Sequence, residues 1–246
     1  LILDALHRRH PPLGAFIRDL EGELTHPVQV NVYRSPANAQ GFGQHYDIHD
    51  VFILHLEGRK RWQIYDRPVP LPLSQGKDTD ALQARRQVVM ELELEPGDLL
   101  YLPRGHLHQT RSVGGPSLHL TVGLLLRKWL RALDVARELA EEQLALRHAM
   151  PPGYVHDRAG FAAGWQAALE ALAQVPVDRL HERLAHRFVR SRRPLPRPPA
   201  PAVDITPDTR LRKRPGLIWR LAPRGDEVRM EWLERRLDLP AYTAPS

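Results

Sequence analysis

His45 and Asp47 stand two residues apart in the segment HYDIHD, and His49 follows two residues later. Residues i and i+2 of a strand face the same side. His45 and Asp47 are therefore predicted to share a face, with Cα atoms about 7 Å apart, close enough to bind one metal ion. His49 would lie about 13 Å from His45 on a regular strand, too far to share that ion unless the strand kinks. A third ligand is expected from elsewhere in the chain.

Residues 103–108 (PRGHLH) offer two further histidines, His106 and His108, directly after a predicted turn and short strand. Spacing alone leaves the choice between them open. Two histidines and one carboxylate that leave coordination positions free are typical of non-heme Fe(II) oxygenases. The competing interpretation is that these histidines are ordinary packed or surface side chains.

Lys60 is the second candidate for chemistry. Residues 51–56 and 61–65 are predicted to form two strands of a hairpin turning at residues 57–59, and Lys60 begins the returning strand. A lysine facing into a barrel is a costly buried cation unless an anion meets it. The far carboxylate of a metal-bound dicarboxylic 2-oxo acid would be such an anion. Alternatively, Lys60 belongs to a solvated charge run, RKR, and spacing does not separate the two interpretations.

The elements that must position these residues follow from periodicity. Alternating patterns predict strands over 28–33, 88–94, 99–102 and 117–126, with a type II turn at 95–98 and a loop over 71–87. Six or more short strands without intervening helices predict an antiparallel barrel or sandwich. Residues 1–24 are predicted to be helical, with an apolar stripe of Leu3, Leu6, Leu13, Phe16, Ile17 and Leu20.

The pattern becomes helical after residue 126. Helices are predicted from Trp129 to a stop at 150–153, and over 158–174 and 177–190. Five prolines over 192–201 indicate a linker. A small module over 210–239 is predicted to have Trp219, Trp232 and Leu237 in its core. The predicted domains are 1–126, 127–191 and 202–246.

Composition sets outer limits. The 246 residues are 42% hydrophobic and include no cysteine, which excludes disulfides and thiolate zinc sites and fits a reducing cytoplasm. We find no signal peptide and no apolar run near the ~20 residues that span a bilayer. The chain begins without methionine, so we expect upstream sequence. The net charge of +6 is unevenly distributed. Residues 179–220 contain twelve basic and three acidic residues, so the remainder of the chain is mildly acidic.

The segments NVYRSPANAQGFGQ, HYDIHDVFILHLEGRKRW, GDLLYLPRGHLHQT and SLHLTVGL together closely resemble the ribosomal oxygenases, which are JmjC-type, cupin-like 2-oxoglutarate oxygenases that hydroxylate ribosomal proteins. The resemblance is specific over residues 27–126 and looser beyond. It implies a mainly β core with added helices: a double-stranded β-helix (jelly-roll) followed by a helical dimerisation region and a winged-helix-like module. It also implies an N-terminal part of the jelly-roll that is largely absent here.

The resemblance assigns roles residue by residue. His45, Asp47 and His108 would bind Fe(II), which chooses His108 over His106. Lys60 would bind the distal carboxylate of 2-oxoglutarate, with Asn31 and Thr121 lining the same pocket, and Tyr33 would lie toward the substrate. Relatives more often have an acid, Gln and an aromatic residue where this chain has His49, His55 and His106. We expect variation on the pocket rim or surface at these positions, and altered substrate choice is the alternative.

The resemblance also narrows the substrate. Histidine-hydroxylating members carry Lys at the position of Lys60 and arginine-hydroxylating bacterial members tend to carry Arg, so the chain is expected in the histidyl branch. We expect a homodimer and a ribosomal-protein substrate, with nucleic acid less favoured although Arg210, Arg212, Lys213 and Arg214 could meet phosphates. The alternatives are a cupin-type metal or ligand sensor with a DNA-binding winged helix, and a JmjC lysine demethylase.

Overall fold

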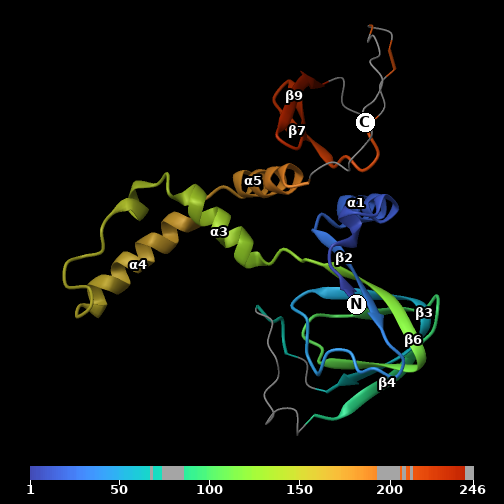
Figure 1. The fold of residues 1–246 in the computed structure, drawn as a ribbon. Helices are drawn as coiled ribbons and strands as arrows, with labels where there is room; N and C mark the ends of the chain where they lie inside the picture. The colour runs from blue at the N-terminus through green and yellow to red at the C-terminus, as the bar shows by residue number, and fades with distance from the viewer. Residues whose placement is uncertain (67–68, 74–85, 193–205, 207–208, 211–212, 242–246) are drawn as a thin grey trace. The chain divides into compact units, whose positions relative to one another are not determined.

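The computed structural model describes residues 1–66, 69–73, 86–192, 206, 209–210 and 213–241 (Figure 1). It divides into two compact units, residues 1–126 with 194–216 and residues 127–193 with 217–246. The three predicted domains, residues 1–126, 127–191 and 202–246, stay a prediction. Most of the predicted linker and Arg212 lie outside the described residues.

The first unit is built on one antiparallel sheet (Figure 1). The strand order is β1-β2-β6-β3-β4, and β5 also pairs with β3. The strands are β1 (Ile2–Leu3), β2 (Val28–Ser35), β3 (Asp50–Tyr65), β4 (Val88–Leu94), β5 (Leu99–Leu102) and β6 (His108–Leu124). The strands predicted over 28–33, 88–94 and 99–102 are confirmed, whereas the strand predicted over 117–126 begins earlier, at His108. The turn at 95–98 is also confirmed, and Gly97 has the positive φ (99°) that a type II turn requires.

The hairpin predicted at residues 57–59 is wrong. β3 runs through this point as one strand, and β6 pairs with it on both sides: Glu57 with Leu118 and Arg59 with Val113. Gly58 has φ +67° and produces a bulge rather than a reversal. A Cβ at Gly58 would lie 2.0 Å from the carbonyl oxygen of Pro116, so β6 crosses directly against it. Lys60 therefore lies on the same strand as Val51, farther along it.

The helix predicted over 1–24 begins only at residue 11. Ile2 and Leu3 pair with β2, a short 3-10 helix η1 (Leu6–Arg8) follows, and α1 spans Pro11–Leu24. Two prolines at the first helical positions fix the start, and His10 accepts a hydrogen bond from the Leu13 N–H at 3.4 Å.

The inner face of α1 covers β2 and β6. Ile17 is buried there with Val28, Val30, Val32, Leu120, Val122 and Leu124, and Leu6, Leu13 and Leu20 pack against this cluster. Phe16 and Leu3 were predicted in the same stripe but are 52% and 41% exposed. The other face of the sheet encloses a second cluster of Val51, Ile53, Trp62, Ile64, Leu94 and Leu102.

The second unit joins helices to a small sheet. Its elements are α3 (Trp129–Ala140), η2 (Leu144–Arg147), α4 (Arg158–Ala173), α5 (Val177–Arg190), β7 (Trp219–Arg224), β8 (Glu227–Trp232) and β9 (Arg235–Pro240). The last two predicted helices are confirmed. The first ends at Ala140, before the predicted stop. Leu237 is 47% exposed, so its predicted core position is wrong, and Ile218, Ala222 and Val228 are buried instead.

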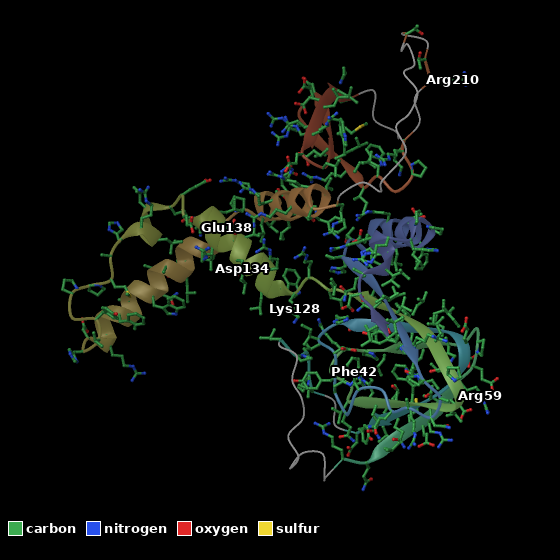
Figure 2. The ribbon with its side chains drawn as sticks, in the orientation of Figure 1. Phe42, Arg59, Lys128, Asp134, Glu138 and Arg210 are labelled. Carbon is green, nitrogen blue, oxygen red and sulfur yellow. The ribbon has the colours of Figure 1, made fainter. Side chains whose placement is uncertain are left out.

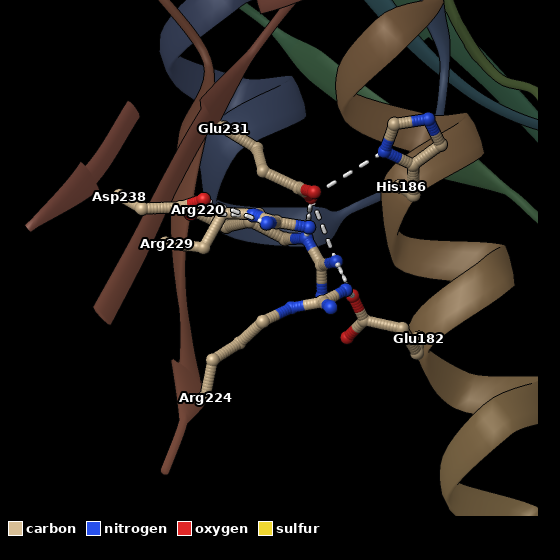
Figure 3. A network of polar contacts seen from close by, with 7 residues as sticks. All are labelled: Glu182, His186, Arg220, Arg224, Arg229, Glu231 and Asp238. Carbon is tan, nitrogen blue, oxygen red and sulfur yellow. Dashed lines mark hydrogen bonds and ion pairs between the residues drawn. The ribbon is translucent and has the colours of Figure 1, made fainter. Parts of the chain in front are cut away.

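A polar network attaches α5 to this sheet (Figure 3). The Arg220 guanidinium donates to Glu231 on β8 at 2.8 Å and to Glu182 on α5 at 2.7 Å. His186 of α5 lies 3.4 Å from the same Glu231 carboxylate, which is 5% exposed. Among the described residues, no helix has the length and apolar character to cross a membrane.

Candidate metal centre

His45, Asp47 and His108 come together at one end of the barrel interior. One ligand atom from each lies within 4.8 Å of the others, which makes them a candidate metal site among the described residues. His45 and Asp47 are not on a regular strand, contrary to the expectation. Instead His45 and His108 exchange two backbone hydrogen bonds (3.1 and 2.8 Å), and the Gly105 N–H donates to the Asp47 carbonyl at 2.9 Å. These bonds hold the two ligand segments side by side.

Both imidazoles are oriented by backbone carbonyls. The Nδ1 of His45 lies 2.8 Å from the Gly43 oxygen, and the Nδ1 of His108 lies 2.9 Å from the His106 oxygen. A carbonyl only accepts, so each Nδ1 carries the proton and each Nε2 keeps a lone pair for a metal. Burial lowers the pKa of His108 to about 4, which keeps it neutral as a ligand must be.

The two spare histidines lie elsewhere. The ring of His49 packs beside Gly123, where an added Cβ would lie 2.8 Å from its Cδ2. His106 closes the turn through its Nδ1, 3.1 Å from the Pro103 carbonyl. Neither joins the group of His45, Asp47 and His108.

Lys60 points into the barrel. It is 2% exposed, and its Nζ lies 3.1 Å from Ser35 Oγ and 3.5 Å from His119 Nδ1. No ion pair joins it to any acid in the described part of the chain. Burial lowers its pKa to about 8. The interpretation of Lys60 as part of a solvated charge run is therefore wrong.

Only the neighbours of Lys60 are solvated. Arg59 and Arg61 extend outward and pair with acids of β4; Arg59 lies 3.0 Å from Glu93 and stands at the barrel edge in Figure 2. The alternation of strand side chains separates Lys60 from both.

The strand register places Lys60 relative to the metal end. Lys60 pairs with Ser112 and Ile64 pairs with His108. Four residues along a strand correspond to about 13 Å between Cα atoms. The Trp62 ring lies between these levels and contacts the rings of both His108 (5.7 Å) and His119 (5.8 Å).

The remaining predicted pocket residues lie on the same face. Asn31 pairs with Thr121 across β2 and β6, and Tyr33 pairs with His119. The side-chain oxygen of Asn31 accepts from the Ala5 N–H at 2.9 Å. Tyr33 stacks on His119, with centroids 5.1 Å apart, and burial raises its pKa.

Three contributors were missed in the sequence. Ser35 and His119 each lie two residues from a predicted site residue, Tyr33 and Thr121, so strand alternation could have found them. Phe42 is 54% exposed and lies edge-on to both Tyr33 and His45, with ring centroids 6.2 and 5.6 Å apart. It sits in a loop whose Gly41 N–H donates to Thr110, and no periodicity marks it.

Several buried polar atoms of the interior have no partner among the described residues: Trp62 Nε1, His55 Nδ1 and Ser117 Oγ. The Trp62 N–H and the Ser117 hydroxyl can donate, so together with the uncompensated Lys60 ammonium they suit a ligand that carries anionic oxygens. The Nε2 of His55 lies 3.1 Å from the Gly58 carbonyl and carries the proton, which leaves its Nδ1 as an acceptor. The site thus combines a candidate metal end of three possible ligands with the buried Lys60 ammonium.

The chain is similar to known proteins over this region. Residues 15–131 match the JmjC domain family. Ribosomal oxygenase 1 of Bos taurus is 38% identical over 152 residues, 57% of this chain and 22% of that protein. The bifunctional lysine-specific demethylase and histidyl-hydroxylase NO66 of Dictyostelium discoideum is 41% identical over 140 residues, 52% of this chain and 26% of that protein. The chain thus spans about a quarter of the length of these relatives.

Solved structures share the fold. The ribosomal oxygenase YcfD of Escherichia coli in complex with cobalt and succinic acid superimposes with a TM-score of 0.58 at 21% identity, over 97% of this chain and 65% of that chain. Its complex with cobalt and 2-oxoglutarate gives 0.56 at 24% identity, with the same coverage. The predicted mainly β JmjC/cupin fold is confirmed. Residues 15–131 therefore carry a JmjC domain, and over this region the chain is similar to ribosomal oxygenases.

Proposed function

We propose that the chain is an Fe(II)- and 2-oxoglutarate-dependent protein hydroxylase. The observation that carries the proposal is the pairing of the His45, Asp47 and His108 group with a buried, uncompensated Lys60 on the same barrel face. A structural metal would need no cation deeper in the barrel. A metal that binds one end of a dicarboxylate would need such a cation, because the cation binds the carboxylate at the other end.

The residues fit Fe(II) and its cosubstrate. Two neutral imidazoles and one carboxylate leave coordination positions open for an organic acid and O₂. Bound iron would supply the redox chemistry: 2-oxoglutarate, O₂ and a substrate C–H yield succinate, CO₂ and the hydroxylated product. The protein would orient the reactants, with Lys60 on the distal carboxylate and Asn31 and Thr121 along the pocket wall. The binding of 2-oxoglutarate by YcfD supports this assignment.

The favoured substrate is a histidine side chain of a ribosomal protein, with arginine second. Lys rather than Arg at position 60 and the histidyl-hydroxylase named among the relatives support histidine. The mildly acidic remainder of the chain suits a basic polypeptide. We place the reaction in the cytoplasm, in keeping with the absence of cysteine.

Lysine demethylation is the second candidate, because the same relatives are also named lysine-specific demethylases. It would use the same metal chemistry and release formaldehyde from an N-methyl group. A sensor with a DNA-binding winged helix is less well supported, since a sensor gains nothing from a buried cation that costs stability.

A homodimer stays part of the proposal. Trp129, Leu133, Phe161 and Trp165 of α3 and α4 are 40–86% exposed, and such apolar faces suit burial against a second copy. The basic residues near 210–214 and a winged-helix fold for the last module remain predictions.

The test is incubation of the protein with Fe(II), 2-oxoglutarate and ribosomal proteins. Hydroxylation predicts succinate and a mass gain of about 16 Da, one oxygen atom, on a ribosomal protein. Loss of about 14 Da per methyl group from methylated histone peptides, with formaldehyde, would favour demethylation instead. Salt-dependent DNA binding without any succinate would contradict both and favour the sensor.

A further inference from the structure

The Lys60 ammonium is surrounded by neutral acceptors rather than by carboxylates. Ser35 Oγ lies 3.1 Å from Nζ, and His119 Nδ1 lies at 3.5 Å, the outer limit of a hydrogen bond. An ammonium has three N–H donors. Two are directed at these acceptors, and the third has no recorded partner in the described part of the chain. The cation is thus oriented without being neutralised.

His119 is itself held firmly. It is 4% exposed and stacks on Tyr33 on one side, with planes 10° apart. The ring of His55 stacks with His119 at a centroid distance of 6.3 Å, and the Trp62 ring packs edge-on against it at 5.8 Å. Burial and the nearby Lys60 lower the pKa of His119 to about 3, so the ring stays neutral across physiological pH. Because its Nδ1 accepts from Lys60, the proton of this ring lies on Nε2.

We infer that His119 is a positioning residue for the distal carboxylate of the cosubstrate. It accepts from Lys60, fixes the direction of the ammonium, and leaves one N–H and the full positive charge for the ligand. A carboxylate in its place would pair with Lys60 and cancel the charge that attracts the dicarboxylate. The inference rests on the proposed function. It adds His119, which orients the Lys60 ammonium, to the residues that bind the cosubstrate.

A matched pair of variants separates this role from simple packing. His119→Asn keeps a neutral acceptor, and His119→Asp has the same size but adds a negative charge. Both lose the imidazole stack to the same degree. The measurement is the Kd of 2-oxoglutarate for the Mn(II)-loaded full chain by calorimetry, which needs no turnover. Pyruvate, a 2-oxo acid without a distal carboxylate, is the control ligand, and circular dichroism checks the fold of each variant.

We expect His119→Asp to bind 2-oxoglutarate about tenfold more weakly than His119→Asn, the effect of cancelling one charge contact. The Kd of pyruvate should be the same in the two variants. Equal Kd values for 2-oxoglutarate in the two variants would overturn the inference, as would a matching loss for pyruvate. Absence of 2-oxoglutarate binding by the wild-type chain would overturn the proposed function and the inference with it.

Discussion

The indole of Trp62 lies against the imidazole of His108, with ring centroids 5.7 Å apart and planes inclined by 24°. Trp62 lies between Ile64, the register partner of His108, and Lys60. One face of β3 therefore sets both ends of the site. Strand geometry therefore fixes the separation between His108 and Lys60, whereas His45 and Asp47 are held to it by backbone hydrogen bonds.

Removal of one metal ligand is the first test. His108→Ala should lower the rate of succinate formation by at least about 100-fold, because losing a ligand costs more than the 10–100-fold of an outer-shell change. It should also weaken Mn(II) binding in calorimetry. His49→Ala is the control, because His49 packs on Gly123 outside the ligand group. It should keep Mn(II) affinity within about threefold, under 1 kcal/mol. Equal losses in both variants would contradict the ligand assignment.

Cosubstrate binding should depend on pH through Lys60. Burial lowers its pKa to about 8 in the empty pocket, so the amine is charged below pH 8 and neutral above it. The affinity for 2-oxoglutarate should be constant from about pH 6 to 7 and fall up to about tenfold per pH unit above pH 8, since binding must then take up a proton. The measurement is Kd against pH, and Lys60→Met should lose both the affinity and its pH dependence. A flat wild-type profile to pH 10 would contradict the role of Lys60.

The same pKa has a consequence for stability. The folded state releases the Lys60 proton near pH 8, whereas the unfolded chain holds it to about pH 10.5. The unfolded state thus binds more protons in this window, and the contribution of Lys60 to stability rises with pH. We therefore expect the free energy of unfolding in urea, measured without ligand, to rise from pH 7.5 to 10 in the wild type relative to Lys60→Met. If the wild type instead lost stability relative to Lys60→Met as the pH rose, the sign would be opposite to that expected for a buried lysine with a lowered pKa.

The bulge in β3 should not tolerate a side chain. Gly58→Ala combines a positive φ with a Cβ only 2.0 Å from the Pro116 carbonyl oxygen, so unfolding in urea should show a loss of about 3 kcal/mol or more. Gly97→Ala is the matched control. It also has positive φ, but its Cβ would meet nothing within 4 Å, so its loss should be only about 1–2 kcal/mol. Similar losses would mean that β6 does not press on the bulge.

The network of Figure 3 should stabilise the second unit. Glu231→Ala removes the more buried of the two carboxylates that pair with Arg220, whose side chain is 16% exposed, and should cost about 2 kcal/mol because a charge-assisted hydrogen bond is lost while Glu182 still pairs with the guanidinium. Glu234→Ala breaks an exposed pair with Arg190 and should cost about 0–1 kcal/mol. Thermal unfolding followed by circular dichroism gives the comparison, and a larger loss for Glu234→Ala would overturn it.

The sequence predicted the strands and the later helices because their periodicity is regular. His45 and Asp47 could be paired from spacing, but only the resemblance chose His108 over His106. The hairpin prediction at Gly58 was wrong, because a glycine with positive φ occurs in hairpin turns and in bulges alike. Only the pairing of β3 with β6 distinguishes the bulge from the turn. The exposure of Phe16 and Leu237 depends on what packs above each element, which local pattern does not encode.

The pairing of β3 with β6 also has a consequence for synthesis. His45 and Asp47 leave the ribosome well before His108, and β2 must wait for Leu124 to find the partner of Val28. Such long-range pairing forms late in folding. The candidate metal site therefore cannot be completed on the nascent chain before His108, the first residue of β6, has emerged.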